Sequence, residues 1–376
     1  MMKPNLLFDS FKKYEIEFFT GVPDSLLKDF CAYISDHTTN REHVITANEG
    51  SAVALASGYS IATNKIPLVY LQNSGLGNTI NPLMSLADKE VYSIPMIVMI
   101  GWRGEPGVKD EPQHVKQGRI QNKLLDAIEV PYKILDGNLT DYDDFVGSVV
   151  EMAKINCGPV AIVVRGDCFE PYKLKNNKIS HFEMVREDAV HEILRNLDDS
   201  EIVVSTTGKT SREVFEYRVR NGQGNQNDFL TVGSMGHTCQ IALGIALFSN
   251  KKIICLDGDG SVIMHLGSLT VVGTSHAKNL IHIVLNNGAH DSVGGQPTVG
   301  FEIDLVKIAE ACGYTIAISV DVKRDIGPVL DRLKKTEGPT FLEIKINKGA
   351  RADLGRPTTT PLNNKLALME ILKNDR

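Results

Sequence analysis

The chain has 376 residues, a length that at about 150 residues per domain predicts two or three domains. Its 40 Lys and Arg against 46 Asp and Glu give a formal net charge of −6. This mild acidity argues against nucleic acid or an anionic membrane as a partner, since either would require a basic surface. Hydrophobic residues make up 42% and charged residues 23% of the sequence, which excludes a largely disordered chain.

The N-terminal stretch MMKPNLLFDSFKK lacks the basic-then-apolar pattern of a signal sequence. No apolar run approaches the ~20 residues of a membrane helix. The 6 cysteines stand far apart, with neither a Cys-x-x-Cys pair nor a cysteine–histidine spacing typical of zinc ligands. We therefore expect reduced thiols in a cytoplasmic protein, not a disulfide framework or a zinc site.

Short apolar runs alternate with longer amphipathic stretches along the chain. The runs predict strands at 67–72, 96–101, 160–165, 202–206, 253–257, 281–287 and 340–346. The stretches predict helices at 51–62, 113–128, 141–155, 186–197 and 363–372. Because the runs are apolar nearly throughout, both faces of each strand should be buried, as in a parallel sheet covered by helices. The alternation predicts an α/β protein with open, doubly wound parallel sheets.

A polar segment with little strand signal, at residues 170–185, divides the chain into two nearly equal halves. Each half has an Ala/Gly-rich helix, an apolar strand and a polar loop with glycine in the same order, the loops being NSGLG (73–77) and GDGS (258–261). This repetition predicts two domains of similar topology, at 1–172 and 186–376, joined by a linker at 173–185. Ligands of such folds bind at the carboxyl ends of the strands.

Polar residues follow two successive predicted strands in the second half. One strand ends in DGDGS (257–261) and the next in NNG (286–288). Neighbouring parallel strands end at one edge of a sheet, so the Asp259 carboxylate, the Asn287 amide oxygen and a backbone carbonyl at Ala289 should reach one cation. Such oxygen ligands suit Mg²⁺ or Ca²⁺ and not zinc. Ordinary turns are the alternative, because Asp-Gly and Asn-Gly are common turn dipeptides.

The same loop can receive an anionic group. Gly258 and Gly260 allow a bulky anion to approach the backbone, and the Ser261 hydroxyl can donate a hydrogen bond to a phosphate. The motif GDG (258–260) with Asn287 at this spacing resembles the signature of enzymes that depend on thiamine diphosphate, also called thiamine pyrophosphate. The resemblance implies that Asp259, Asn287 and the Ala289 carbonyl hold Mg²⁺ on the diphosphate.

The resemblance also assigns cofactor contacts outside this loop. Met235, in GSMG (233–236) with Gly233, would wedge between the two rings of the cofactor and keep it bent. The loop TTGK (206–209), which includes Gly208, and Asn73 in LQNSGLGN (71–78) would contact the cofactor as well. By itself, Met235 could equally be a buried methionine at the start of a helix.

An acid at the start of an apolar helix in the first half is the candidate for cofactor activation. Glu49 opens the stretch EGSAVALASGY, and the resemblance implies that its carboxyl group hydrogen-bonds the pyrimidine ring. Such acid–base help accelerates reactions by ~10²–10⁴-fold. The alternative is a first-turn acid that stabilises the helix dipole by ~0.3–1 kcal/mol. In this family the glutamate and the metal site come from different subunits, which implies a homo-oligomer, at least a dimer, with active sites between subunits.

Two-domain decarboxylases of sulfopyruvate and phosphonopyruvate are the family members that the chain resembles, since it has no room for the middle domain of the larger members. The shared segments are GVPDS (21–25), LQNSGLGN, GWRGEPGVKDEPQH (101–114), GSMGH (233–237) and ADLGRPTTTP (352–361). A fused chain favours 3-phosphonopyruvate, converted through the thiamine diphosphate ylide to phosphonoacetaldehyde and CO₂, for 2-aminoethylphosphonate synthesis. Sulfopyruvate as substrate, a carboligated product and a non-catalytic nucleotide-binding subunit are the alternatives.

Two loops carry the cations expected to bind an anionic 2-oxo acid. Arg103 and Lys109 lie in the first loop, and Arg351 and Arg356 in the second. Guanidinium groups suit a phosphonate because they present paired donors, although each cation could instead be a solvated loop charge. Two further residues are candidates for the proton transfer that follows CO₂ loss, namely Asp24 and His114. Asp24 is equally suited to cap the helix that follows it.

Overall fold

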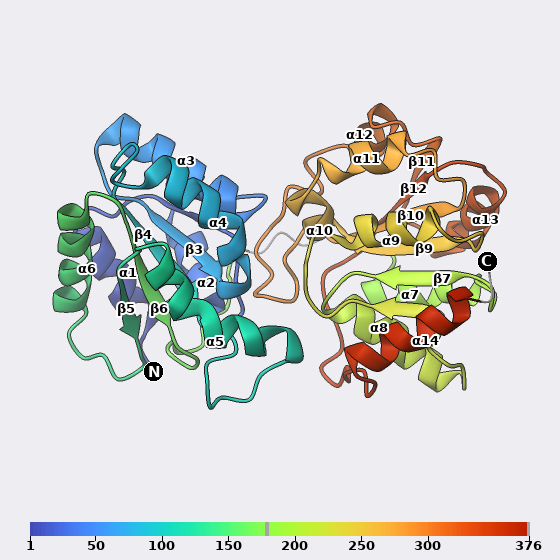
Figure 1. Cartoon of the computed structure of the whole chain (residues 1–376), viewed down its shortest axis with the longest axis horizontal. Coiled ribbons are helices and arrows are strands. Elements are labelled where there is room, and N and C mark those ends of the chain that lie inside the picture. The colour runs from blue at the N-terminus through green and yellow to red at the C-terminus, as the bar shows by residue number, and fades with distance from the viewer. Residues whose placement is uncertain (177–179, 374–376) are drawn as a thin grey trace. The chain divides into compact units, whose positions relative to one another are not determined.

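The structure of the chain is a computed structural model that describes residues 1–176 and 180–373. It consists of two compact units, residues 1–177 with 293–296 (unit 1) and residues 178–292 with 297–376 (unit 2), each shown in Figure 1. The division falls within the predicted linker at 173–185, of which residues 177–179 lie outside the described residues. None of the helices formed by the described residues is long and apolar enough to cross a membrane.

Unit 1 contains a six-stranded parallel sheet in the order β2-β1-β3-β4-β6-β5. Its strands are β1 (Phe19–Gly21), β2 (His43–Ile45), β3 (Leu68–Gln72), β4 (Met96–Gly101), β5 (Tyr132–Leu135) and β6 (Pro159–Val164). Its helices are α1 (Pro4–Lys13), α2 (Lys28–His37), α3 (Glu49–Thr63), α4 (Leu76–Pro82), α5 (Pro112–Ala127) and α6 (Tyr142–Asn156). Two short turns, η1 (Asn73–Gly75) and η2 (Leu83–Ala87), flank α4.

Unit 2 contains a second six-stranded parallel sheet, in the order β11-β12-β10-β9-β7-β8. Its strands are β7 (Ile202–Ser205), β8 (Asp228–Leu230), β9 (Ile253–Gly258), β10 (Leu280–Asn286), β11 (Ile316–Val320) and β12 (Thr340–Lys345). Its helices are α7 (Arg186–Arg195), α8 (Lys209–Arg220), α9 (Thr238–Ala246), α10 (Asp259–Met264), α11 (Ser268–Thr274), α12 (Leu305–Ala311), α13 (Lys323–Lys334) and α14 (Pro361–Lys373).

Both sheets have the same topology. Read from one edge, each follows the order second, first, third, fourth, sixth and fifth strand of its own unit. The predicted fold class, two doubly wound parallel-sheet domains of similar topology, is confirmed. Every strand predicted from the sequence is present, whereas β1, β2, β5, β8 and β11 were not predicted. Except for β1, these are sheet edges, and β1 is only three residues long, so none shows the long apolar run of a central strand.

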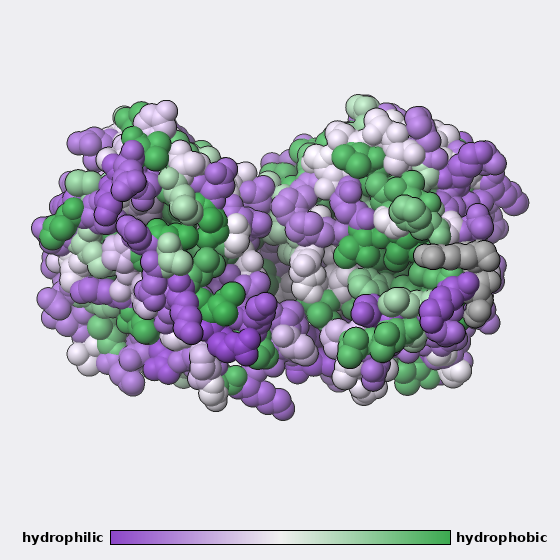
Figure 2. All heavy atoms as spheres, in the orientation of Figure 1, coloured by the Kyte–Doolittle hydropathy of each residue, from purple (hydrophilic) through white to green (hydrophobic). Residues whose placement is uncertain are grey.

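Helices cover both faces of each sheet, which explains why the central strands are apolar throughout. In β4, Ile97 and Met99 pack with α1, α2 and α6, whereas Val98 and Ile100 pack with α3 and α5. In unit 2, α7, α8 and α13 cover one face and α9, α11 and α12 cover the other. Hydrophobic and hydrophilic side chains are interspersed on the surface of each unit, as Figure 2 shows. The polar loops that concern function follow the carboxyl ends of the strands.

Candidate active site

Glu49 is the first residue of α3, directly after the edge strand β2. Asn48 caps the helix, because its side-chain oxygen accepts a hydrogen bond from the Ser51 N–H at 2.9 Å. Glu49 follows this cap residue, and it is buried in unit 1, with only 5% of its surface exposed. The Asn78 amide donates to Glu49 Oε2 at 2.7 Å. The other carboxyl oxygen, Oε1, faces Gly75.

The loop after β3 is shaped around this carboxyl group. A Cβ atom at Gly75 would lie 2.1 Å from Glu49 Oε1, so only glycine leaves the carboxylate its place. Asn73, two residues earlier, is buried, and its amide donates to the Arg103 carbonyl at 2.7 Å. Its Oδ1 atom is buried and has no hydrogen-bond partner among the residues that the structure describes. A buried acceptor of this kind is costly unless a ligand supplies a donor.

Asp24 lies in the turn after β1 and is fully buried. Its Oδ2 accepts a hydrogen bond from the Leu26 N–H at 3.0 Å within this turn, and it does not cap α2, whose N-cap residue is Leu27. Burial raises the pKa of Asp24 to about 6, although the Leu26 N–H and the Arg103 charge act in the opposite direction. A Cβ atom at Gly101 would lie 2.0 Å from this carboxylate, so the end of β4 also approaches it closely.

Arg103 connects the loop after β4 to the turn that contains Asp24. Its guanidinium forms an ion pair with both oxygens of Asp110 and donates to the Ser25 hydroxyl at 2.7 Å. His114 is 8% exposed near the start of α5, with Nδ1 unpartnered. Burial and the Arg103 charge lower the pKa of His114. The structure therefore gathers the predicted residues Asp24, Arg103 and His114 in unit 1.

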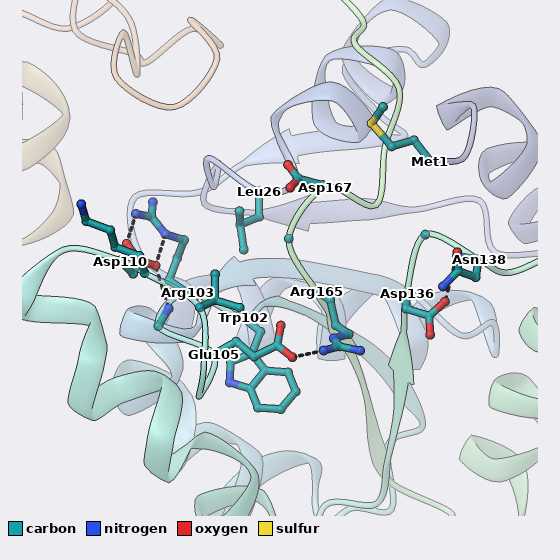
Figure 3. A pocket seen from close by; sticks show the side chains of 15 residues that line it. Met1, Leu26, Trp102, Arg103, Glu105, Asp110, Asp136, Asn138, Arg165 and Asp167 are labelled. Atoms are coloured by element: carbon teal, nitrogen blue, oxygen red, sulfur yellow. Dashed lines mark hydrogen bonds and ion pairs between the residues drawn. The ribbon is translucent and has the colours of Figure 1, made fainter.

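A pocket of about 540 Å³ opens at the carboxyl ends of β4, β5 and β6, and Figure 3 shows it from close by. Lys109 lines it and is exposed, whereas the Arg103 side chain is directed to Asp110. Glu105, at its wall, forms an ion pair with Arg165. Of the two cations predicted in this loop, Lys109 is therefore exposed at the pocket, while Arg103 forms an ion pair with a carboxylate of its own loop.

Asp259 is the first residue of α10, directly after β9, and its side chain is 2% exposed. Its Oδ1 accepts a hydrogen bond from the Asn287 N–H at 3.4 Å, and its Oδ2 accepts one from the Thr298 hydroxyl. Burial raises the pKa of Asp259 to about 6, against the effect of the Thr298 hydrogen bond. A bound cation would compensate the burial of this charge.

The loop after β10 contacts Asp259 through the Asn287 backbone N–H. The Asn287 side-chain oxygen accepts a hydrogen bond from the Ala289 N–H at 3.0 Å, which closes a tight turn. Ala289 and Pro297 form an isolated antiparallel bridge, which brings Thr298 back to Asp259. The donor set of a carboxylate, an amide oxygen and backbone carbonyls is one of hard oxygens and fits Mg²⁺. The side-chain oxygens of Asp259 and Asn287 accept hydrogen bonds from neighbouring N–H and hydroxyl groups. A carboxylate or amide oxygen can accept such a bond and bind a metal ion at the same time.

Ser261 joins three loops of unit 2. Its hydroxyl oxygen accepts hydrogen bonds from the Gly236 N–H at 3.0 Å and from the Thr206 hydroxyl at 3.2 Å. The loops after β7, β8 and β9 therefore converge, so that GSMG (233–236) and TTGK (206–209) lie beside GDGS. Gly208 caps α8 with φ 90°, a conformation that favours glycine.

The Met235 side chain reaches the loop that contains Asp259. A Cβ atom at Gly260 would lie 3.4 Å from Met235 Cε and 3.3 Å from His290 Nδ1, whereas one at Gly258 would meet nothing within 4 Å. Met235 is partly exposed, and so is Gly233 at the start of the same loop. Small residues thus leave the backbone at Gly258 open to an anionic group, and the partly exposed Met235 side chain lies beside the same loop.

The second pair of predicted substrate-binding cations is placed differently. The Arg351 guanidinium forms ion pairs with Glu187, Glu216 and Asp353, all in unit 2. Arg356 is exposed in the same loop. The ion pairs with Glu187 and Glu216 join the loop that contains Arg351 to α7 and α8.

Several residues of the site escaped sequence reasoning. Asn78 donates a hydrogen bond to Glu49, Thr298 donates one to Asp259, and Asp110 forms an ion pair with Arg103. Asn78 and Asp110 belong to segments singled out for their resemblance, but nothing in the spacing of either assigns it a partner. Thr298 returns to Asp259 through a loop without a regular pattern, so no periodicity could indicate the contact.

Comparison with known proteins places both units in one family. Residues 4–129 match the profile described as thiamine pyrophosphate enzyme, N-terminal TPP binding domain, and residues 206–344 match the C-terminal TPP binding domain. Phosphonopyruvate decarboxylase of Streptomyces viridochromogenes is 35% identical over 357 residues, 91% of this chain and 87% of that protein. The enzyme of that name from Streptomyces hygroscopicus is 34% identical and covers 91% and 86%. Sulfopyruvate decarboxylase of Methanosarcina acetivorans is 28% identical and covers 90% and 89%.

Proposed function

Because the chain belongs to the family of thiamine pyrophosphate-dependent decarboxylases, we propose that it converts 3-phosphonopyruvate to phosphonoacetaldehyde and CO₂. The observation that supports this most strongly is the 35% identity to a phosphonopyruvate decarboxylase over 91% of the chain. The site agrees with it, since a buried glutamate in unit 1 and an oxygen cluster in unit 2 follow strand ends of two like domains.

The residues of unit 2 would hold the diphosphate end of the cofactor. We assign Asp259, Asn287 and the Ala289 carbonyl to Mg²⁺, and the Ser261 hydroxyl with the glycine-rich backbone to the phosphates. Met235 would support the rings. When bound, thiamine diphosphate accepts the electron pair released as CO₂ departs.

Glu49 would hold a proton at the aromatic nitrogen of the cofactor. Its position fits this task because Asn78 fixes Oε2 at 2.7 Å while Oε1 faces the small surface of Gly75. Its burial excludes water, which strengthens a hydrogen bond from the carboxyl group. Asn73, with a buried unpartnered Oδ1, is suited to accept a hydrogen bond from the cofactor.

Asp24 and His114 are our candidates for moving the proton that replaces CO₂ on carbon. Burial gives Asp24 a pKa of about 6, so a protonated fraction exists near neutral pH and the group can act as an acid. Because burial lowers the pKa of His114, the imidazole is neutral and can accept a proton. Lys109, exposed at the rim of the pocket, is suited to attract the phosphonate, while Arg103 orients the loop.

A second copy of the chain would complete the active site. Helix α3, whose sequence is apolar on most sides, leaves Leu55 38% and Ile61 73% exposed although it begins with Glu49. Apolar residues on a helix that carries a catalytic acid favour a covered surface. We propose a homodimer, or a larger assembly of dimers, in which Glu49 of one copy serves the metal site of another.

The test measures CO₂ release and product identity with 3-phosphonopyruvate, 3-sulfopyruvate and pyruvate under the same conditions. We expect 3-phosphonopyruvate to show the highest kcat/KM and to give phosphonoacetaldehyde. Activity lost on dialysis against a chelator should return only when Mg²⁺ and thiamine diphosphate are both added. A preference for 3-sulfopyruvate, or a carboligated product, would contradict the substrate assignment while leaving the cofactor assignment intact.

A further inference from the structure

A row of polar side chains crosses the apolar layer between the sheet of unit 2 and helices α9, α11 and α12. Asp257 and His282 are 0% exposed, and Tyr314 is 5% exposed. Asp257 follows Cys255 on one face of β9, and His282 lies on the same face of β10, since alternate residues point to opposite layers. Cys255, Tyr314 and Phe341 belong to the apolar cluster of this layer.

These side chains form a continuous path that ends at the backbone beside Asp259. The Tyr314 hydroxyl lies 3.0 Å from His282 Nδ1, and His282 Nε2 lies 3.5 Å from Asp257 Oδ2. The other carboxyl oxygen of Asp257 accepts a hydrogen bond from the Gly258 N–H at 3.0 Å. Gly258 is the capping residue of α10, whose first residue is Asp259. We call Tyr314, His282 and Asp257 the buried brace.

One placement of the protons gives each polar atom of this path a donor or an acceptor. If the Tyr314 hydroxyl donates to Nδ1, the imidazole keeps its proton on Nε2, which then faces Asp257 Oδ2. Both His282 Nε2 and Asp257 Oδ2 are buried, and neither makes a hydrogen bond to any described residue; the two atoms face each other at 3.5 Å, which is longer than a usual hydrogen bond. Leaving a buried donor and a buried carboxylate oxygen unpaired costs roughly 1–3 kcal/mol each, so the two groups are best explained as partners.

We propose that Tyr314 and His282 are positioning residues, which orient Asp257 and thereby the Gly258 turn that sets the place of Asp259. This inference rests on the proposed function, because it assigns the brace to the site for Mg²⁺ and the diphosphate. The role is indirect, since these residues lie beneath the loop and not on its ligand side. Partners that orient metal ligands in this way change metal affinity by about 10–100-fold when removed.

A metal in the brace is the competing explanation. Cys255 Sγ, a carboxyl oxygen of Asp257 and a nitrogen of His282 all lie within 4.8 Å of one another. Such ligands suit zinc, but a closed structural zinc site takes four protein ligands, and this group offers three. The brace gives the His282 and Asp257 atoms a role without an ion, and the Cys255 thiol packs in the apolar cluster of the same layer.

The experiment compares His282→Leu, His282→Gln and Tyr314→Phe in the full-length protein. The matched control is Cys255→Ala, which removes a buried side chain of the same layer outside the brace. Mg²⁺-dependent thiamine diphosphate affinity is measured by calorimetry after dialysis, together with kcat at saturating cofactor, the melting temperature and the zinc content.

We expect His282→Leu to weaken cofactor binding by about tenfold or more, with kcat at saturation within about twofold of the original value. His282→Gln should recover most of the affinity because its amide can donate to Asp257, and Tyr314→Phe should fall between the two. Cys255→Ala should lower the melting temperature without weakening the affinity.

Three results would overturn the inference. The first is an unchanged cofactor affinity in His282→Leu. The second is a loss of cofactor affinity in Cys255→Ala as large as that in His282→Leu for the same drop in melting temperature, because the loss would then reflect lower stability alone. The third is one zinc per chain that disappears in Cys255→Ala. Failure of the unmodified protein to bind thiamine diphosphate with Mg²⁺ would instead contradict the proposed function, so the two failures are distinguishable.

Discussion

Replacing Glu49 with Gln separates the two roles open to this side chain. Glutamine has nearly the same shape, and its Oε1 can still accept the hydrogen bond that Asn78 donates at 2.7 Å. It removes the ionisable carboxyl group at the first turn of α3. A first-turn acid stabilises its helix by ~0.3–1 kcal/mol, so the free energy of unfolding should fall by about 1 kcal/mol.

The effect on turnover should be much larger. Loss of positioned acid–base help lowers rates by ~10²–10⁴-fold, which corresponds to roughly 3–5 kcal/mol of activation free energy. We therefore expect Glu49→Gln to lower kcat at least about a hundredfold while Mg²⁺-dependent thiamine diphosphate binding persists. The assay is CO₂ release at saturating cofactor, with urea unfolding measured in parallel.

A matched control is available in the same unit. Asp144 is also an acid in the first turn of a helix, α6, and it lies away from the site. Asp144→Asn should cost a similar free energy of unfolding and leave kcat unchanged. If Glu49→Gln changed kcat by less than about threefold, the side chain would be a helix-stabilising acid alone, and the catalytic role would be wrong.

Three further outcomes follow from the geometry. Gly75→Ala should lower kcat at least about tenfold, because the added Cβ would lie 2.1 Å from Glu49 Oε1. Gly77→Ala is the control and should leave kcat unchanged, because a Cβ there would meet nothing within 4 Å. The measurements are kcat and the melting curve of each variant. Asp259→Asn should weaken Mg²⁺-dependent thiamine diphosphate binding, measured by calorimetry, about a hundredfold. If the variant bound the cofactor as tightly as the original protein, Asp259 would not be a metal ligand. Because burial raises the pKa of Asp24 from 3.8 to about 6, the folded state loses stability as pH rises through that range. Relative to the original protein, Asp24→Asn should gain about 3 kcal/mol between pH 3 and pH 7 in urea unfolding, and a difference independent of pH would contradict the raised pKa.

Much of the site could be predicted because its residues follow strand ends. Asp259 and Asn287 lie after adjacent strands, and the structure brings the Asn287 backbone N–H within hydrogen-bond distance of the Asp259 carboxylate. Arg103 and Arg351 show the limit of this reasoning. Both were predicted to bind the phosphonate, yet each guanidinium is held by carboxylates from its surroundings. Charge in a loop indicates where an anion could bind, but which partner a side chain selects depends on its neighbours in space.

The edge strands show a similar limit. The strand β5 has the burial pattern of a half-covered strand, and β2 is partly exposed throughout. Strands that face solvent need fewer apolar residues, so their sequences do not differ clearly from those of loops. The central strands were predictable because helices cover both of their faces.

The amino-acid sequence alone determines the alternation of strand and helix, the division into two like halves and the glycine-rich turns, because periodicity and local backbone preference act over neighbouring residues. Only the folded chain decides that Asn78 holds Glu49, that Thr298 meets Asp259 and that Tyr314, His282 and Asp257 share one path. These groups come from different strands and loops, and the packing of the sheets sets the distances between them.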